Sequence, residues 1–95
     1  MRIRWTLPAA DDLENIKNYL DWHFPHFSQP TVRAIYKRAK SLKTMPNIGR
    51  PGRCRGTREL PLSPLPYVIV YAVKLEAVEI LHIYHGSQDR REARL

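Results

Sequence analysis

The chain has 95 residues, of which 43% are hydrophobic and 26% charged, and its formal net charge is +7 at pH 7. This length and composition indicate one ordinary globular domain over residues 1–95. The longest apolar run, PYVIVYAV, is too short to cross a bilayer as a helix, so we expect no membrane partner.

The N-terminal stretch and the cysteine content indicate a compartment. MRIRW is charged and does not resemble a signal peptide. Cys54 is the single cysteine, so no internal disulfide can form, which fits a reducing environment. We therefore expect a cytoplasmic protein.

The positive charge is concentrated in one part of the sequence. Residues 1–21 are close to neutral, whereas residues 22–58 contain nine Lys or Arg and no Asp or Glu. Such segregation predicts one electropositive face, which favours nucleic acid or an acidic protein segment as the partner. The alternative is that the basic residues serve solubility alone.

The first third of the chain predicts a strand and a helix. RIRWT alternates apolar with polar residues, as a strand does. Apolar residues then recur at helical spacing between Leu13 and Leu20, and Pro8 suits a first turn, so an amphipathic helix is expected over about residues 8–23. Pro25 should end it, because proline cannot continue the hydrogen-bond ladder.

A second helix is expected to begin near Ser28, a good N-cap, and to end before Pro46. Its buried stripe should consist of Val32, Ile35, Tyr36, Ala39 and Leu42. Basic residues occupy most of its other positions: Arg33, Lys37, Arg38, Lys40 and Lys43. The outer side of this helix is therefore almost wholly cationic.

Beyond this helix the periodicity becomes that of strands. The loop GRPGRCRGTREL, residues 49–60, leads into three strand candidates, RELPL, YVIVYAV and VEILHIYH. Short links between them predict an antiparallel meander with YVIVYAV in the centre. We therefore expect an α+β fold of order β-α-α-β-β-β, in which a two-helix hairpin packs on one face of a small antiparallel sheet and leaves the other face partly open.

The sequence lacks the motifs of the common cofactor enzymes. One cysteine and four scattered histidines do not give the spacing of a metal site. A phosphate-binding loop, a dinucleotide fingerprint and a serine-nucleophile motif are also missing. We expect no metal and no cofactor.

One candidate reactive cluster remains. Arg58 begins a strand and His85 ends the last one, and we expect both to share one edge of the meander. Histidine exchanges protons near neutral pH, and arginine stabilises charge on a phosphate. Metal-free RNA cleavage needs these parts, with His85 as acid or base and Arg58, Arg53 and Arg50 around the phosphate.

Each candidate also has a structural interpretation. His82 alternates with the apolar residues before it, which favours a histidine in the core or on the sheet face. His85 can cap the sheet, and Tyr84 can be an ordinary strand residue. Glu59 can simply pair with a neighbouring arginine.

Several segments resemble a known family. GRPGRCRGTREL, PYVIVYAV and VEILHIYHG, in this order, resemble the RelE/ParE superfamily of toxins from type II toxin–antitoxin systems, as does AADDLENIKNYL upstream. The resemblance covers about residues 2–90 and implies the same strand–helix–helix–strands fold. It also implies a small basic cytoplasmic toxin that a cognate acidic antitoxin holds inactive in a hetero-oligomer.

The resemblance implies one of two targets. RelE-like members cut messenger RNA on the ribosome, whereas ParE-like members poison DNA gyrase. The RNA-cutting branch commonly has a basic residue where this chain has Val68, and another after the last strand, where it has Gly86, Ser87 and Gln88. One RNA-cutting subgroup has a histidine at the place of His85, but GTREL and PYVIVY are more similar to ParE-like sequences.

We therefore expect a ParE-like toxin that arrests growth by binding gyrase and is not itself an enzyme. A RelE-like, ribosome-dependent mRNA endonuclease, with His85 and Arg58 as catalytic residues, is the second hypothesis, and a non-toxic basic binding module is the third. Target contacts are expected from Arg50, Arg53, Arg55, Arg58, Glu59, His82, Tyr84, His85, Arg90 and Arg91. The last residues, about 88–95, are expected to form a flexible tail or a short helix.

Overall fold

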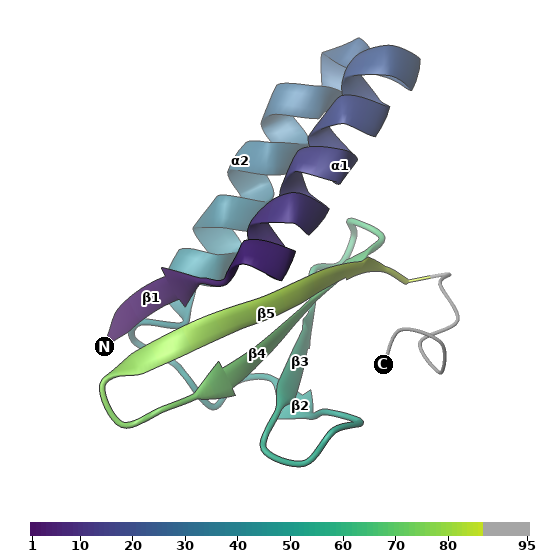
Figure 1. The fold of residues 1–95 in the computed structure, drawn as a ribbon. Coiled ribbons are helices and arrows are strands. Elements are labelled where there is room, and N and C mark those ends of the chain that lie inside the picture. The colour runs from purple at the N-terminus through teal and green to yellow at the C-terminus, as the bar shows by residue number, and fades with distance from the viewer. Residues whose placement is uncertain (87–95) are drawn as a thin grey trace.

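A helical hairpin stands over one face of a twisted sheet in the computed structural model, which describes residues 1–86 (Figure 1). The elements are β1 (Arg2–Trp5), α1 (Leu7–His23), α2 (Pro25–Ser41), β2 (Arg50–Pro51), β3 (Arg58–Pro61), β4 (Tyr67–Val73) and β5 (Ala77–His85). The predicted α+β architecture is confirmed. The expectation for residues 88–95 lies outside the described residues.

The sheet has five strands in the order β1-β5-β4-β3-β2. β3, β4 and β5 form the expected antiparallel meander, with β4 in the middle. β1 pairs parallel with β5, and the two residues of β2 pair with β3, so the sheet is mixed rather than purely antiparallel. Local periodicity predicts that a strand exists but not which neighbour it joins, and a two-residue strand is too short to show a period.

Thr6 fixes the start of α1 against the sheet. Its Oγ1 accepts a hydrogen bond from the backbone N–H of Ala9 (3.4 Å), which satisfies one of the free donors of the first turn. The same hydroxyl donates to the carbonyl oxygen of Ile80 on β5 (2.7 Å). The N-cap of α1 therefore also sets how the helix leaves the sheet.

The second helix begins earlier than the sequence suggests. Pro25 ends α1 as expected, but it also occupies the first turn of α2, so only Phe24 separates the two helices. Ser28, the expected N-cap, is buried inside α2, and its hydroxyl donates to the carbonyl oxygen of Lys17 on α1 (3.5 Å). The prediction for Ser28 is wrong because the Phe24–Pro25 junction already turns the chain.

The core lies between the sheet and the half of the hairpin nearest to it. Helix residues Ala9, Leu13, Ile35, Ala39 and Leu42 pack against strand residues that include Ile69, Tyr71, Val78, Ile80 and Ile83. Burying these apolar side chains is the main source of stability. Figure 1 shows that the far end of the hairpin extends beyond the sheet, where Tyr19, Trp22, Phe24 and Phe27 are exposed.

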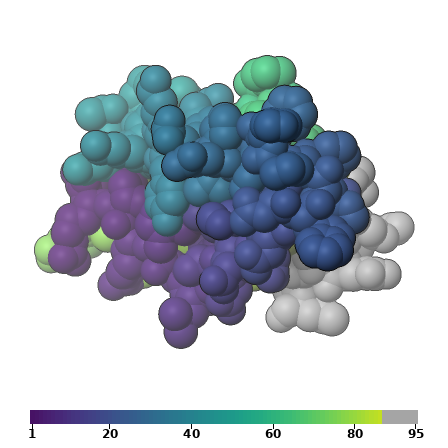
Figure 2. Space-filling view, turned by 90° about the horizontal axis from the view of Figure 1, so that it is seen from above, coloured from purple at the N-terminus to yellow at the C-terminus, as the bar shows by residue number. Residues whose placement is uncertain are grey.

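Figure 2 shows the same hairpin from above, with α1 and α2 forming one continuous surface over the sheet. Across residues 1–86, neither helix is both long and apolar enough to span a bilayer.

Candidate functional site

The arginine-rich loop between β2 and β3 ends in a tight turn with an exposed tip. The backbone N–H and the hydroxyl of Thr57 both donate to the carbonyl oxygen of Cys54, at 3.1 and 2.6 Å. Gly56 has φ +81°, in the left-handed region that favours glycine. Arg53 and Arg55 lie in this tip and are exposed to solvent.

The buried carboxylate of Glu59 stabilises the loop through contacts with Arg50 and Arg53. It is the one charged side chain that is buried among residues 1–86. Its carboxylate pairs with the guanidinium of Arg50 (3.4 Å) and accepts a hydrogen bond from the backbone N–H of Arg53 (3.4 Å). The predicted pairing of Glu59 with an arginine is therefore confirmed. Because the carboxylate is buried, it would be costly to leave without these partners.

Arg58, the first residue of β3, is bound to the backbone of the segment that precedes β2. Its Nη1 donates to the carbonyl oxygens of Gly49 (2.6 Å) and Asn47 (3.3 Å). The buried Tyr71 on β4 holds the same segment, because its hydroxyl donates to the carbonyl oxygen of Pro46 (2.8 Å) and accepts from the N–H of Gly49 (2.8 Å). Arg58 and Tyr71 therefore fasten this part of the loop to the sheet.

The histidine end of β5 lies beside α1. Oδ2 of Asp12 accepts the backbone N–H of Ile83 (2.9 Å) and lies 3.0 Å from Nδ1 of His82. The ring of His82 stacks on Tyr84, with centroids 5.5 Å apart and an angle of 11°. Because β1 stops opposite Ile80, β5 is an edge strand beyond that point, and Asp12 supplies the acceptor that no strand provides.

Of the two positions expected for His82, in the core or on the sheet face, the core position is wrong. The register between β4 and β5 shifts, so that Tyr71 pairs with Ile80 and Val70 pairs with His82, which leaves Leu81 as an extra residue. Such a bulge changes the face to which the following residues point. His82 therefore lies half-exposed at the strand edge and not in the core.

His85 lines an open groove of about 610 Å³ between α1 and the ends of β4 and β5. Its ring meets Tyr67 edge-on, with centroids 5.5 Å apart, and burial raises the pKa of the Tyr67 hydroxyl. The rest of the lining is mainly apolar or aromatic: Asp12, Asn15, Ile16, Tyr19, Leu20, Phe24, Pro66 and Ile83. This composition favours apolar groups as ligands.

The expectation that Arg58 and His85 share one edge of the sheet is wrong. Arg58 pairs with Tyr71 near the end of β4, whereas His85 pairs with Tyr67 at its start. Two successive antiparallel pairings make β3 and β5 run in the same direction, so the start of one lies away from the end of the other. The backbone positions of Arg58 and His85 are therefore about 13 Å apart along the strand direction and about 10 Å apart across the sheet.

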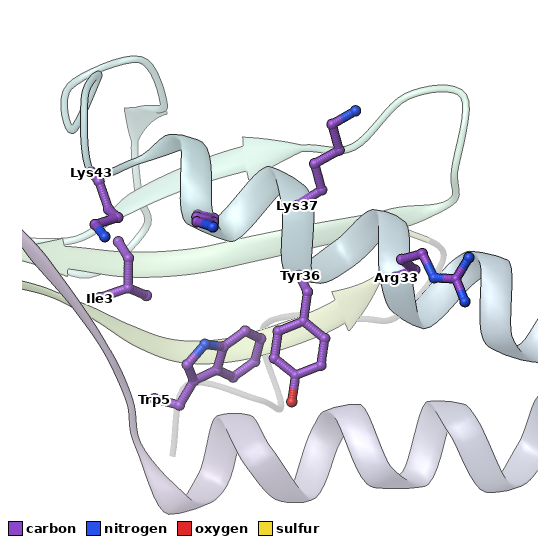
Figure 3. Close-up of a pocket in the computed structure, with 7 residues that line it drawn as sticks. Ile3, Trp5, Arg33, Tyr36, Lys37 and Lys43 are labelled. Carbon is purple, nitrogen blue, oxygen red and sulfur yellow. The ribbon is translucent and has the colours of Figure 1, made fainter.

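A second groove, which the sequence did not indicate as a site, lies between β1 and α2 (Figure 3). It has a volume of about 510 Å³ and is lined by Ile3, Trp5, Arg33, Tyr36, Lys37, Lys40 and Lys43. We call it the α2 groove. The rings of Trp5 and Tyr36 lie side by side in it, with centroids 5.1 Å apart.

Part of the α2 groove was visible in the sequence. Arg33, Lys37, Lys40 and Lys43 are exposed as predicted, whereas Arg38 is partly buried. Tyr36, which the helical spacing places in the buried stripe, is 51% exposed. Helical spacing alone cannot separate a core position from one at the margin of the stripe. The contact with Trp5 of β1 depends on how the helix crosses the sheet.

Two further sequence predictions concern metal ligands and the C-terminal residues Arg90 and Arg91. Residues 1–86 contain no group of three or more His, Cys, Asp or Glu side chains that could hold a metal ion. Arg90 and Arg91 lie outside the described residues, so their predicted contacts stay predictions.

Comparison with protein families assigns the chain to a family. A family model described as the ParE toxin of the type II toxin–antitoxin system parDE matches residues 3–90. The chain belongs to the ParE toxin family. A toxin of such a system has an antitoxin as its partner, so the expected toxin function and antitoxin partner are confirmed.

Individual relatives of this ParE toxin support the assignment. It is 40% identical over 87 residues to Y4kP of Sinorhizobium fredii, a protein described as a candidate toxin, with 92% of this chain and 90% of that protein covered. It is 33% identical over 87 residues to Toxin RelE2 of Caulobacter vibrioides, with 92% and 97% covered. Among solved structures, a chain of the chromosomal ParDE system from P. aeruginosa matches with a TM-score of 0.82 and 30% identity, covering 90% of this chain and 95% of that one.

Proposed function

We propose that this ParE toxin arrests growth by binding DNA gyrase and trapping it on DNA, without cleaving RNA itself. The separation of Arg58 from His85 supports this proposal most strongly. A metal-free nuclease must hold its proton-transfer group and its phosphate-stabilising cations around one phosphate. Arg58 is moreover bound to the backbone carbonyl oxygens of Asn47 and Gly49.

In this proposal the exposed arginines of the loop tip, Arg53 and Arg55, contact the target. Arg50, Arg58 and Glu59 act indirectly, because they hold the loop in shape. The predicted contacts His82, Tyr84 and His85 form a second region in the proposal, and contacts from Arg90 and Arg91 are proposed as well. A cytoplasmic location, expected from the lone Cys54, belongs to the same proposal.

The test is DNA supercoiling by purified gyrase with increasing amounts of the toxin. We expect supercoiling to stop and cleaved gyrase–DNA complexes to accumulate, and we expect the cognate antitoxin to restore activity. The double variant Arg53→Ala with Arg55→Ala should require at least ten times more protein than the wild type for the same inhibition. Full gyrase activity at saturating amounts of a toxin that arrests cells would refute the proposal.

The second candidate is a ribosome-dependent mRNA endonuclease, which the 33% identity to Toxin RelE2 favours. In that case His85 would transfer the proton, and cations other than Arg58 would have to surround the phosphate. Primer extension on translated mRNA distinguishes the two candidates, since only the endonuclease gives cuts in phase with the codons.

We also infer that the antitoxin is acidic and forms a hetero-oligomer with the toxin. The support is the run of nine Lys or Arg without Asp or Glu over residues 22–58. Association of opposite charges is fast and is weakened by salt. An association rate that stays constant between low and high salt would contradict an acidic partner.

A further inference from the structure

The α2 groove carries basic side chains that no other described group neutralises. Arg33, Lys37, Lys40 and Lys43 are exposed, and within residues 1–86 none of their side chains forms an ion pair or a hydrogen bond. The neighbouring Arg38 differs, because its Nη2 donates to the carbonyl oxygen of Pro61 (3.4 Å).

We propose that the α2 groove binds single-stranded nucleic acid, with phosphates along the basic residues of α2 and a base against the aromatic pair. The spacing supports the first part. Arg33, Lys37 and Lys40 are four and three residues apart, so they follow one side of the helix at intervals of about 4.5 to 6 Å. Lys43 continues the row beyond the end of α2, and together they offer four positive charges to one extended anion.

The helix dipole alone does not explain where these charges lie along α2. Basic residues in the last turn interact favourably with the helix dipole, and Arg38 and Lys40 lie there. Arg33 and Lys37 lie earlier in α2, where that effect has faded.

The aromatic pair supports the second part of the proposal. Tyr36 is 51% exposed, and it lies beside Trp5 below α2 in the view of Figure 3, while Arg33 and Lys43 lie toward opposite ends of the groove. Proteins that bind single strands combine a basic groove with aromatic rings on which bases stack. A duplex keeps its bases paired and stacked, so it would not use this aromatic surface.

The lining also distinguishes a nucleic acid from an acidic protein segment. Three of the four cations are lysines, which bind phosphates as point charges without a fixed pairing geometry. Ile3 is the one aliphatic residue in the lining, so the groove offers few sockets for the apolar side chains of a peptide.

This inference goes beyond the proposed action on gyrase and does not depend on it. Its test uses no gyrase, so the two proposals can fail separately. The probe is a fluorescently labelled dT20 oligonucleotide, with a duplex of the same length and a poly-Glu peptide as comparisons, and binding to the purified full chain is measured by anisotropy.

We expect dT20 to bind more tightly than the duplex and to displace poly-Glu. The logarithm of the binding constant should fall with the logarithm of the salt concentration with a slope of roughly −3, as expected for four phosphates of a single strand. The fluorescence of Trp5 should be quenched on binding, measured in a Trp22→Phe background because Trp22 is 83% exposed and would otherwise dominate the signal.

Matched variants locate the site. K37E should weaken dT20 binding by about tenfold, and K37E with K40E should reduce the slope by about 1.4. K74E changes the net charge as much as K37E but lies outside the groove, and it should leave the affinity within about twofold. Tyr36→Ala should weaken binding about fivefold or more, and Tyr36→Phe should keep it, because phenylalanine retains the stacking face.

Three results would overturn the proposal. Equal losses from K37E and K74E would mean that net charge, and not this groove, attracts the oligonucleotide. An unchanged affinity of Tyr36→Ala together with equal binding of the duplex would exclude base stacking. Stronger binding of poly-Glu than of dT20 would assign the groove to an acidic protein segment.

Discussion

The arginine-rich segment of residues 49–60, here called the arginine loop, and the α2 groove are both rich in positive charge, but the charged side chains make different contacts in the two regions. In the loop, Arg50 pairs with the buried Glu59, and Arg58 donates to two backbone carbonyl oxygens. In the α2 groove, the side chains of Lys37 and Lys40 have no such contact within the described residues. The density of arginine in a sequence therefore does not show which cations can bind a ligand.

The two regions also differ in what a substitution should change. Substitutions of the loop's buried or bonded residues, such as Gly49 and Glu59, should lower the free energy of unfolding, because these residues are part of the packed structure. Substitutions in the α2 groove should change binding and leave stability almost unaltered. The following predictions test this difference.

The largest effect on stability is expected from Gly49→Ala. A Cβ at this position would lie 2.6 Å from the hydroxyl oxygen of Tyr71 and 2.9 Å from the carbonyl oxygen of Glu59. Relieving such overlap in a packed region should cost about 2–3 kcal/mol of the free energy of unfolding, measured by urea denaturation. Gly86→Ala is the control, since its new Cβ would meet no atom of residues 1–86 closer than 3.4 Å and should change stability by less than about 0.5 kcal/mol.

Tyr71→Phe should cost about 2 kcal/mol. The variant removes two hydrogen bonds of 2.8 Å, one to Pro46 and one from Gly49, each contributing about 1 kcal/mol. Urea denaturation measures the loss, and Tyr36→Phe, at an exposed position of the α2 groove, should show none. Equal stabilities of the two variants would contradict the anchoring role of Tyr71.

Glu59→Gln should cost about 1 kcal/mol, because the amide keeps the shape but loses the charge that Arg50 and the N–H of Arg53 face. Lys37→Ala is the matched removal of a charge in the α2 groove and should stay within about 0.5 kcal/mol of the wild type. Thermal denaturation of both variants at the same pH decides the point. A larger loss for Lys37→Ala would reverse the comparison.

The smallest effect is expected at Asp21, a surface carboxylate that is paired. The hydrogen bond from the ammonium group of Lys17 (2.7 Å) lowers its pKa below the ordinary value. A lowered pKa in the folded state means that the pairing stabilises the fold at neutral pH and that this contribution is lost as the pH falls through the folded pKa. An NMR titration should show the low pKa, and Lys17→Ala should raise it; an unchanged value would show that the pair is not formed in solution.

The sequence predicted the elements well because each depends on neighbouring residues. The helical spacing of Leu13 and Leu20 and the apolar run of YVIVYAV were enough to place α1 and β4. The exposed cations of α2 could also be predicted, since residues on the outer side of an amphipathic helix face solvent.

The contacts between distant residues could not be predicted in the same way. The bond between Asp12 and Ile83 depends on the bulge at Leu81 and on the edge that β1 leaves open, and neither has a local signal. The error about Arg58 and His85 had another cause, because the strand order was right but the directions of β3 and β5 were combined wrongly. The direction of every strand must be followed through the sheet before residues from two ends are joined into one site.

The measurement that tests the central claim most directly compares wild-type toxin with His85→Ala in a gyrase supercoiling assay and in primer extension on translated mRNA. A gyrase inhibitor should give no codon-phased cuts, and His85→Ala should require less than about tenfold more protein for the same inhibition. General acid–base catalysis contributes about 10²- to 10⁴-fold to a rate. Codon-phased cuts by the wild type that His85→Ala slows by that factor, with supercoiling unaffected, would contradict the account.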